Sequence, residues 1–314
     1  MIVFIVLLNI VILPKMKLDK AMKLLKKENY EDVYALLWEI GNYDAIASSK
    51  SDRAMKLLEK ENYEDAYKLL REIGDKETIA SSEYDRAMKL IDEKKYVSAF
   101  TLLNGLDYKD SEKKLEEIKV PYEKEAISKA DVGASITFGA YEPEGYVSSG
   151  KETIEWIVLE KTNNKALIIS KYALDEQPYN TEFAGVTWET CSLRRWLNDT
   201  FLKNAFNEEE QASIETVTVT ADKNPEYATN PGNNTMDKVF LLSIAEAEKY
   251  FTTGGRKCVT ATSKVECLWW LRSPGWDQAY AVVVNDIGGI ETAGADVNCD
   301  AFSVRPALWI NLEP

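Results

Sequence analysis

The apolar positions in the first third of the chain recur with a fixed period. Residues 21–41 (AMKLLKKENYEDVYALLWEIG) and 54–74 (AMKLLEKENYEDAYKLLREIG) differ only at positions 26, 33, 35 and 38 of the first copy. A third, diverged copy starts at Ala87, so Ala21, Ala54 and Ala87 mark a period of 33 residues. Periods near this length with two short apolar runs per unit are typical of stacked helix pairs. We therefore expect a helical solenoid over residues 15–130.

Each copy carries two apolar stripes at helical spacing. In the second copy the first stripe contains Leu57 and Leu58, and the next runs from Tyr63 to Ile73 and ends at Gly74, as its counterpart ends at Gly41. The pattern resembles tetratricopeptide repeats in length and helix pairing, although the Trp and Pro positions of that motif are missing. Such repeats bind peptides or act as spacers, and three short acidic units favour a spacer or an oligomerisation arm.

The chain begins with an apolar segment, Met1–Leu13, interrupted only by Asn9 and followed by Pro14 and several lysines. The run is shorter than the roughly 20 residues that span a bilayer, and it lacks the basic start and cleavage site of a secretory signal. We interpret residues 1–14 as the end of a truncated membrane anchor, which would place the protein at the cell membrane or cell surface. A packed hydrophobic helix is the alternative.

After Asp131 the helical spacing gives way to alternation with many aromatic residues and turn residues. Strands are predicted at 135–141, 153–160 and 166–172, the last two joined by a hairpin at Asn163–Asn164. Helices are predicted at 188–206 and, after a strand at 239–242, at 244–250, where Ser243 and Glu246 form a capping box. Residues 131–314 are therefore expected to form an α+β domain.

Charge and composition narrow the function classes. The chain has 38 basic and 52 acidic side chains and a net charge of -14, which repels phosphate backbones, so no nucleic-acid partner is expected. Histidine is absent, which excludes histidine-activated nucleophiles, histidine general bases and most zinc sites. Cys191, Cys258, Cys267 and Cys299 contain no C-x-x-C pair and are interpreted as buried free thiols. A disulfide joining Cys267 to Cys258 or to Cys299 is the alternative if the domain is exported.

Four ordered motifs cover the C-terminal domain: WETCSLRRWLNDTF (188–201), VFLLSIAEAEKYF (239–251), CLWWLRSPG (267–275) and VRPALWINL (304–312). Together they resemble an uncharacterised bacterial domain family, common in Firmicutes, of the C-type-lectin and formylglycine-generating-enzyme fold. The resemblance implies that the two domain ends pair as strands and that long loops display a ligand surface. Within it, Trp269, Trp270, Leu271 and Leu308 are expected in the core, and Arg272 and Arg305 as buried ion-pair partners.

The segment 276–302 between the last two motifs is similar in position to the variable region of lectin-fold proteins diversified by retroelements. Its aromatic side chains offer rigid contact area, and its acids and amides offer hydrogen bonds. We therefore expect recognition of an unidentified protein or glycan, without turnover, cofactor or bound metal. Ordinary solvated loops are the alternative. The candidate ligand-binding residues are Trp276, Asp277, Gln278, Tyr280, Asn285, Asp286, Glu291, Asp296, Asn298, Asp300 and Phe302.

Other functions have less support in the sequence. The oxidase chemistry of the formylglycine-generating branch needs two cysteines close together near the chain end, whereas Cys267 and Cys299 are far apart. A calcium ion would need carboxylates and amides gathered from Asn285, Asp286, Asp296, Asn298 and Asp300. Glycoside hydrolysis would need a defined carboxylate pair, and no motif singles one out. A purely structural module that mediates assembly is the remaining alternative.

Overall fold

The computed structural model describes residues 11–143 and 150–313, which form two compact units, residues 1–116 and 117–314. The division lies before the boundary expected at residue 131, because helix α9 (Lys119–Lys129) packs within the C-terminal unit. Its Ile127 is fully buried in the core of that unit, and Lys119 pairs with Glu210 at 2.7 Å. The helix thus belongs to the α+β unit although its sequence continues the helical pattern.

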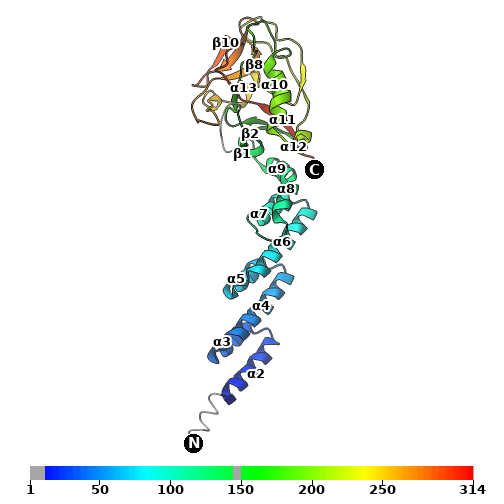
Figure 1. Ribbon diagram of the computed structural model, residues 1–314, viewed down its shortest axis with the longest axis vertical. Helices are drawn as coiled ribbons and strands as arrows, with labels where there is room; N and C mark the ends of the chain where they lie inside the picture. The colour runs from blue at the N-terminus through cyan, green and yellow to red at the C-terminus, as the bar shows by residue number, and fades with distance from the viewer. Residues whose placement is uncertain (1–10, 144–149, 314) are drawn as a thin grey trace. The chain divides into compact units, whose positions relative to one another are not determined.

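The described residues of the N-terminal unit form helices that pair with their sequence neighbours (Figure 1). The pairs α2–α3, α4–α5 and α6–α7 follow the 33-residue period, so the predicted helix pairs are present. α8 follows them and ends at the division between the units. The helices are α2 (Leu13–Leu25), α3 (Tyr30–Glu39), α4 (Tyr43–Glu59), α5 (Tyr63–Ile73), α6 (Lys76–Asp92), α7 (Tyr96–Leu103) and α8 (Ser111–Glu117).

Polar side chains begin most of these helices. Asn29, Asn42, Asn62 and Asp75 each accept a hydrogen bond from the backbone N–H three residues on, which satisfies a donor that the helix leaves open. Lys95 occupies the same place before α7 and makes no such bond. α5 ends at Gly74, whose φ of 75° is left-handed as expected.

Two contacts recur one repeat apart and tie each helix pair to the next. One is a guanidinium over a tyrosine ring, and the other is a lysine–glutamate ion pair on the surface. They are Arg53 over Tyr30 at 5.0 Å and Arg86 over Tyr63 at 4.5 Å, with Lys56–Glu28 at 2.7 Å and Lys89–Glu61 at 2.6 Å.

Most of the expected anchor, residues 1–10, lies outside the described residues. Pro14 stands in the first turn of α2, where its missing N–H removes no helical hydrogen bond. None of the described helices has the length and apolar character needed to cross a membrane.

Two five-stranded sheets form the C-terminal unit, with orders β1-β2-β3-β12-β7 and β10-β9-β8-β11-β4, and β5 and β6 form a small ribbon. Figure 1 shows α10 to α12 and α13 around these sheets. Trp156, Trp269 and Trp270 are fully buried between the elements, as expected for the last two. The strands are β1 (Ser135–Tyr141), β2 (Glu152–Lys161), β3 (Lys165–Ser170), β4 (Asp175–Glu176), β5 (Val217–Val219), β6 (Thr235–Asp237), β7 (Val239–Phe240), β8 (Trp269–Pro274), β9 (Tyr280–Val284), β10 (Ile290–Asp296), β11 (Ser303–Val304) and β12 (Ala307–Asn311).

The chain is therefore an α+β protein, and the predicted β2–β3 hairpin turns at Asn163 and Asn164. The expected pairing of the domain ends is wrong: β1 and β12 share a sheet but are separated by β2 and β3. β12 pairs instead with β3, where Leu308 lies opposite Ile168. β1 follows α9 and lies at the edge of this sheet, where its strand partner is β2.

The helix predicted at 188–206 begins at Ser192, since Cys191 has an extended backbone and caps the helix. It runs as α10 (Ser192–Trp196), a π-helical turn η2 (Leu197–Phe201) and α11 (Leu202–Ala205), followed by α12 (Glu208–Ser213). The π-helical turn brings the apolar face of this helix, including Leu197 and Phe201, into the core. The predicted capping box is present at the start of α13 (Ile244–Tyr250), and a short 3₁₀ turn, η3, follows at Gly254–Arg256.

Candidate functional site

The β9–β10 hairpin divides the expected ligand-binding residues into separate groups. Tyr280 lies opposite Asp296 at the open end of the hairpin, and Val284 lies opposite Ile290 beside its turn. The two ends are four residues apart along β9, about 13 Å at the usual rise of a strand. Trp276, Asp277, Gln278, Tyr280 and Asp296 therefore gather at the open end, whereas Asn285, Asp286 and Glu291 gather at the turn.

Three aromatic rings form an exposed cluster at the open end, which we call the aromatic platform: Phe183, Trp276 and Tyr280. The Trp276 and Tyr280 ring centroids are 5.0 Å apart, and Phe183 meets Tyr280 edge to face at 6.2 Å. Trp276 is 52% exposed and Phe183 57% exposed, and Tyr280 is half-buried between them. Exposed aromatic area gathered in this way is uncommon unless something binds it.

The turn before Tyr280 fixes the platform by backbone contacts. The N–H of Gly275 donates to the Tyr280 carbonyl at 2.7 Å, and the N–H of Trp276 donates to the Ala293 carbonyl at 2.9 Å. A side chain at position 275 would meet the Ala293 oxygen at 2.4 Å, so this close approach requires glycine. Trp276 is therefore held at its backbone while its ring remains exposed.

Two carboxylates lie beside the platform. Asp277 accepts a hydrogen bond from the Ala279 N–H at 3.0 Å, and Asp296 lies opposite Tyr280 in the hairpin. The negative charge of Asp296 raises the pKa of Tyr280, because losing the phenolic proton would place two negative charges side by side. Across residues 11–143 and 150–313, neither Asp277 nor Asp296 forms an ion pair with a lysine or arginine.

The residues at the hairpin turn bond mainly to one another. Asn285 donates to Glu291 at 2.6 Å and accepts from the Gly289 N–H at 2.7 Å. The Gly288 carbonyl accepts from the buried Arg256 at 2.9 Å. Asn285 and Glu291 therefore shape the turn, while Asp286 and the neighbouring Ile287 remain exposed.

The last three expected residues lie in the segment that follows β10. Phe302 packs edge to face on the buried Trp270 with ring centroids 4.8 Å apart, which gives it a packing role. Asp300 lines a surface cavity of about 480 Å³ together with Asp175 and Thr260, and Asn298 is exposed. Phe302 therefore belongs to the core, and Asp300 to a separate surface cavity.

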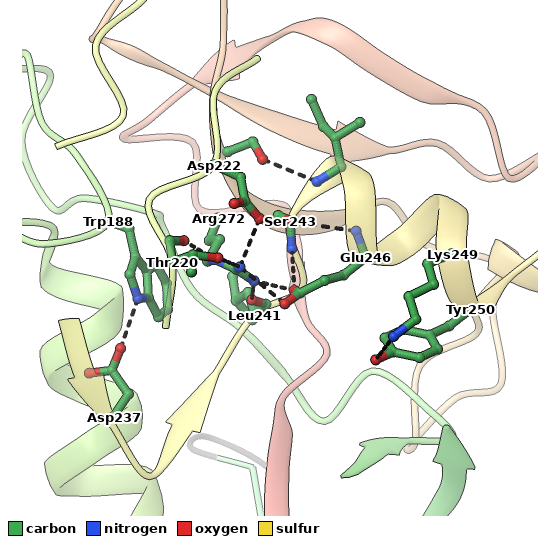
Figure 2. A network of polar contacts seen from close by, with 12 residues as sticks. Trp188, Thr220, Asp222, Asp237, Leu241, Ser243, Glu246, Lys249, Tyr250 and Arg272 are labelled. Carbon is green, nitrogen blue, oxygen red and sulfur yellow. Dashed lines mark hydrogen bonds and ion pairs between the residues drawn. The ribbon is translucent and has the colours of Figure 1, made fainter. Parts of the chain in front are cut away.

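Arg272 fixes the strand that leads to Trp276 (Figure 2). It is 3% exposed and forms a bidentate ion pair with Glu246 at the start of α13, with 3.1 Å between Nη2 and Oε1. Nη2 also contacts Asp222 Oδ2 at 3.2 Å, and Nε donates to the Thr220 carbonyl at 3.2 Å. The expected role of Arg272 as a buried ion-pair partner is confirmed, and this one side chain joins β8, α13 and the segment after β5.

Two loops are held against the platform through amide groups. Asn224 donates to the carbonyls of Pro274 and Thr292, both at 2.8 Å. The Gln278 side-chain amide donates to the Asn230 carbonyl at 3.0 Å, and the Gln278 backbone carbonyl accepts from the Val186 N–H at 2.9 Å. Gln278 thus positions the loops that flank the platform.

Residues 163–312 match a family model. Its description is a domain of unknown function, DUF6273. No curated protein and no solved structure matches the chain. The DUF6273-like segment contains the platform, Arg272 and all of β3 to β12, and its two ends are paired, since Lys165 lies opposite Asn311 and Leu312 donates to the Asn164 carbonyl at 2.7 Å. The strands at the two ends of the matched segment, β3 and β12, are therefore paired with each other, whereas β1 lies before the matched segment.

The expected role of Arg305 as an ion-pair partner is wrong. Arg305 is 1% exposed, and its guanidinium lies 5.1 Å from the rings of both Phe251 and Trp269. Nε donates to the Ser170 carbonyl at 2.9 Å, but within the described part of the chain no carboxylate contacts the guanidinium and Nη1 has no partner. The neighbouring groups that could carry a negative charge are the thiols of Cys258 and Cys267.

No group of three or more acidic or cysteine side chains within the described ranges is arranged to hold a metal ion. Asp296 and Asn285 stand at opposite ends of the hairpin, so the five residues of the calcium alternative are not brought together. All four cysteines are free thiols; Cys191, Cys258 and Cys267 are buried and Cys299 is half-buried. The expected free thiols are confirmed, and Cys267 neighbours Cys258 rather than Cys299.

Phe183 was not among the predicted ligand-binding residues. It lies in an irregular segment about a hundred positions before Trp276, where neither periodicity nor a motif indicates a role. The sequence does contain one indication of its exposure. Phe183 stands among Gly, Thr and Glu in a loop, where no strand or helix face would bury its ring.

Proposed function

We propose that the C-terminal unit is a ligand-binding domain that recognises a basic segment of a partner protein at the aromatic platform, without catalysing a reaction. The observation that carries the proposal is the exposed contact of Phe183, Trp276 and Tyr280, brought together from two distant segments. We further propose that the unit has a lectin-like fold, with the platform in the position where such folds display a ligand surface.

Charge and ring chemistry support a cationic ligand. A lysine or arginine side chain over an aromatic face gains about 0.5 to 2 kcal/mol, depending on how far it is desolvated. Asp277 and Asp296 flank the rings and have no cationic partner in the described part of the chain, so each can accept a charge-assisted hydrogen bond from the ligand. The net charge of -14 also speeds the approach of a basic partner.

The platform suits rigid binding. Its rings carry few rotatable bonds, and Gly275, Gln278 and Arg272 fix the backbone beneath them, so little conformational entropy is lost when a ligand binds. A partner would bury the platform's apolar area at about 25 cal/mol per Å².

The test is titration calorimetry of the full-length protein with an oligolysine peptide, and with the same peptide fully acetylated on its lysines. We expect salt-sensitive binding of the first peptide alone. Trp276→Ala combined with Tyr280→Ala should weaken binding at least 10-fold while the melting temperature changes little, because the Trp276 ring is exposed and Tyr280 is only half-buried. Asp277→Asn with Asp296→Asn should remove most of the salt dependence.

The matched controls lie at the other end of the same hairpin. Ile287→Ala and Asp286→Asn change exposed residues of similar character and should leave the affinity unchanged. Equal binding by the platform variants would refute the site. Salt-independent binding of a neutral oligosaccharide, lost with the ring variants and retained by the Asp→Asn variants, would replace the basic segment with a glycan.

A further inference from the structure

Cys258 and Cys267 lie opposite each other in a second, short hairpin. Val259 and Glu266 form an antiparallel bridge, and Thr260 donates to the Val265 carbonyl at 2.9 Å. One step further, Cys267 donates its backbone N–H to the Cys258 carbonyl at 3.1 Å, which keeps the same register. Hydrogen-bonded opposite residues have Cα atoms about 5.5 Å apart, within the range that a disulfide spans.

The thiols also lie within the electrostatic reach of a buried positive charge, Arg305. Among the described residues Arg305 has no carboxylate partner, and its Nη1 is left unbonded in the core, as are the hydroxyls of Ser170 and Ser303. A buried guanidinium without a counter-charge is costly, so a thiolate is the anion that this site favours. The neighbouring Cys267 thiol and the charge of Arg305 lower the pKa of Cys258 to about 7 despite its burial. Cys258 in turn raises the pKa of Cys267, which keeps the proton.

We infer that Cys258 and Cys267 form a redox-active pair that hydrogen peroxide oxidises to a disulfide and that a thiol reductant can restore. The Cys258 thiolate attacks one peroxide oxygen, the O–O bond breaks and hydroxide leaves, taking the proton of Cys267. The Cys267 sulfur then attacks the Cys258 sulfur, and the S–O bond breaks as a second hydroxide leaves and is protonated by solvent. The two cysteines lose two electrons, and the peroxide is reduced to two waters.

Arg305 makes this disulfide easy to reduce. In the reduced pair, the Cys258 thiolate offers the guanidinium a counter-charge. In the disulfide that counter-charge is lost while the guanidinium remains buried. Stabilising the reduced form shifts the couple toward a more oxidising potential. The pair thus suits a reversible switch better than a permanent crosslink.

The hairpin that the pair closes forms one wall of a cavity. Its turn residues Ala261, Thr262 and Lys264 line a space of about 200 Å³ opposite Tyr141 and Tyr172. Lys264 lies over the Tyr172 ring at 3.4 Å. A crosslink at the base of this hairpin would restrict the movement of that wall.

Trypsin separates the two cysteines, which makes the crosslink directly readable. Cleavage after Lys257, Lys264 and Arg272 gives the peptides 258–264 and 265–272. The full-length protein is treated with limiting hydrogen peroxide, quenched in acid, alkylated under denaturing conditions and digested. We expect the two peptides to appear joined by a disulfide and to separate again after equilibration with reduced glutathione.

Cys191 is the internal control, because it is buried without a thiol partner and burial raises its pKa to about 12. It should stay alkylatable while the linked peptide forms. Cys258→Ser or Cys267→Ser should each abolish the link, and Cys299→Ser should leave it unchanged. Arg305→Met should make the disulfide harder to reduce by glutathione; if that variant does not fold, the cysteine variants still decide the question. Loss of Cys191 and Cys258 at equal rates without the linked peptide, or a Cys267–Cys299 link, would overturn the inference.

Discussion

Arg272 joins more segments around the platform than any other side chain described above. Its guanidinium is buried, while Glu246 and Asp222 are each about a third exposed on their side chains, at 29% and 34%. The charges it neutralises therefore keep some hydration, which moderates the cost of losing it. The planar guanidinium also makes a bidentate contact with Glu246 that a lysine ammonium cannot make.

We expect Arg272→Ala to lower the free energy of unfolding by about 3 kcal/mol, the lower end for breaking a buried pair, and to weaken platform binding. Arg272→Lys should recover only part of the loss. Urea unfolding followed by tryptophan fluorescence measures both. Lys203→Ala is the control, because its pair with Asp199 is exposed at both ends and should contribute nothing measurable. An unchanged midpoint for Arg272→Ala would show that the network is dispensable.

At the scale of elements, α7 lacks the side-chain cap that its counterparts α3 and α5 have in the earlier repeats. Lys95 has φ and ψ of -100° and 64°, close to the -87° and 73° of Asn62 one repeat earlier, but only Asn62 caps its helix with a side chain. The backbone at residue 95 is therefore already arranged for a capping asparagine.

Lys95→Asn should stabilise α7 by about 1 kcal/mol, the usual value of a capping side chain, at the loss of a surface ion pair with Glu93. Hydrogen exchange of the amides in residues 96–103, read by mass spectrometry, should slow accordingly. Asn62→Ala is the matched opposite change and should speed exchange in α5. If Lys95→Asn leaves exchange unaltered, the cap in the other repeats is not what stabilises their first turns.

Local chemistry decided which elements could be predicted. The Ser243–Glu246 capping box and the β2–β3 hairpin at Asn163–Asn164 depend on neighbouring residues, and both appeared where the sequence indicated. The helix predicted from Trp188 began later, because Cys191 takes an extended backbone that apolar spacing does not reveal. The platform could be predicted only in part: Trp276 and Tyr280 share a turn, whereas Phe183 reaches them through the tertiary fold.

At the scale of the whole molecule, the position of α9 decides where one folding unit ends. Periodicity assigns residues 119–129 to the repeats, because a helix looks the same in sequence whichever core it joins. In the structure Ile127 is buried in the core of the β-rich unit, and the Lys161 ammonium donates to the Ala130 carbonyl at 2.7 Å. Those contacts tie the helix to the β-rich unit.

Two fragments test this assignment. Residues 117–314 should fold alone with the near-ultraviolet circular dichroism of packed tryptophans, whereas residues 131–314 should be less stable by at least about 1.5 kcal/mol, because burying an Ile side chain contributes about 1.5 to 3 kcal/mol. The shorter fragment loses Ile127, which is fully buried in the core of this unit. It also leaves the buried Glu210 carboxylate without Lys119. Lys119→Ala in the longer fragment isolates that charge effect, so the remaining difference measures apolar burial. If both fragments unfold at the same urea concentration, α9 belongs to the repeats and the unit begins at residue 131.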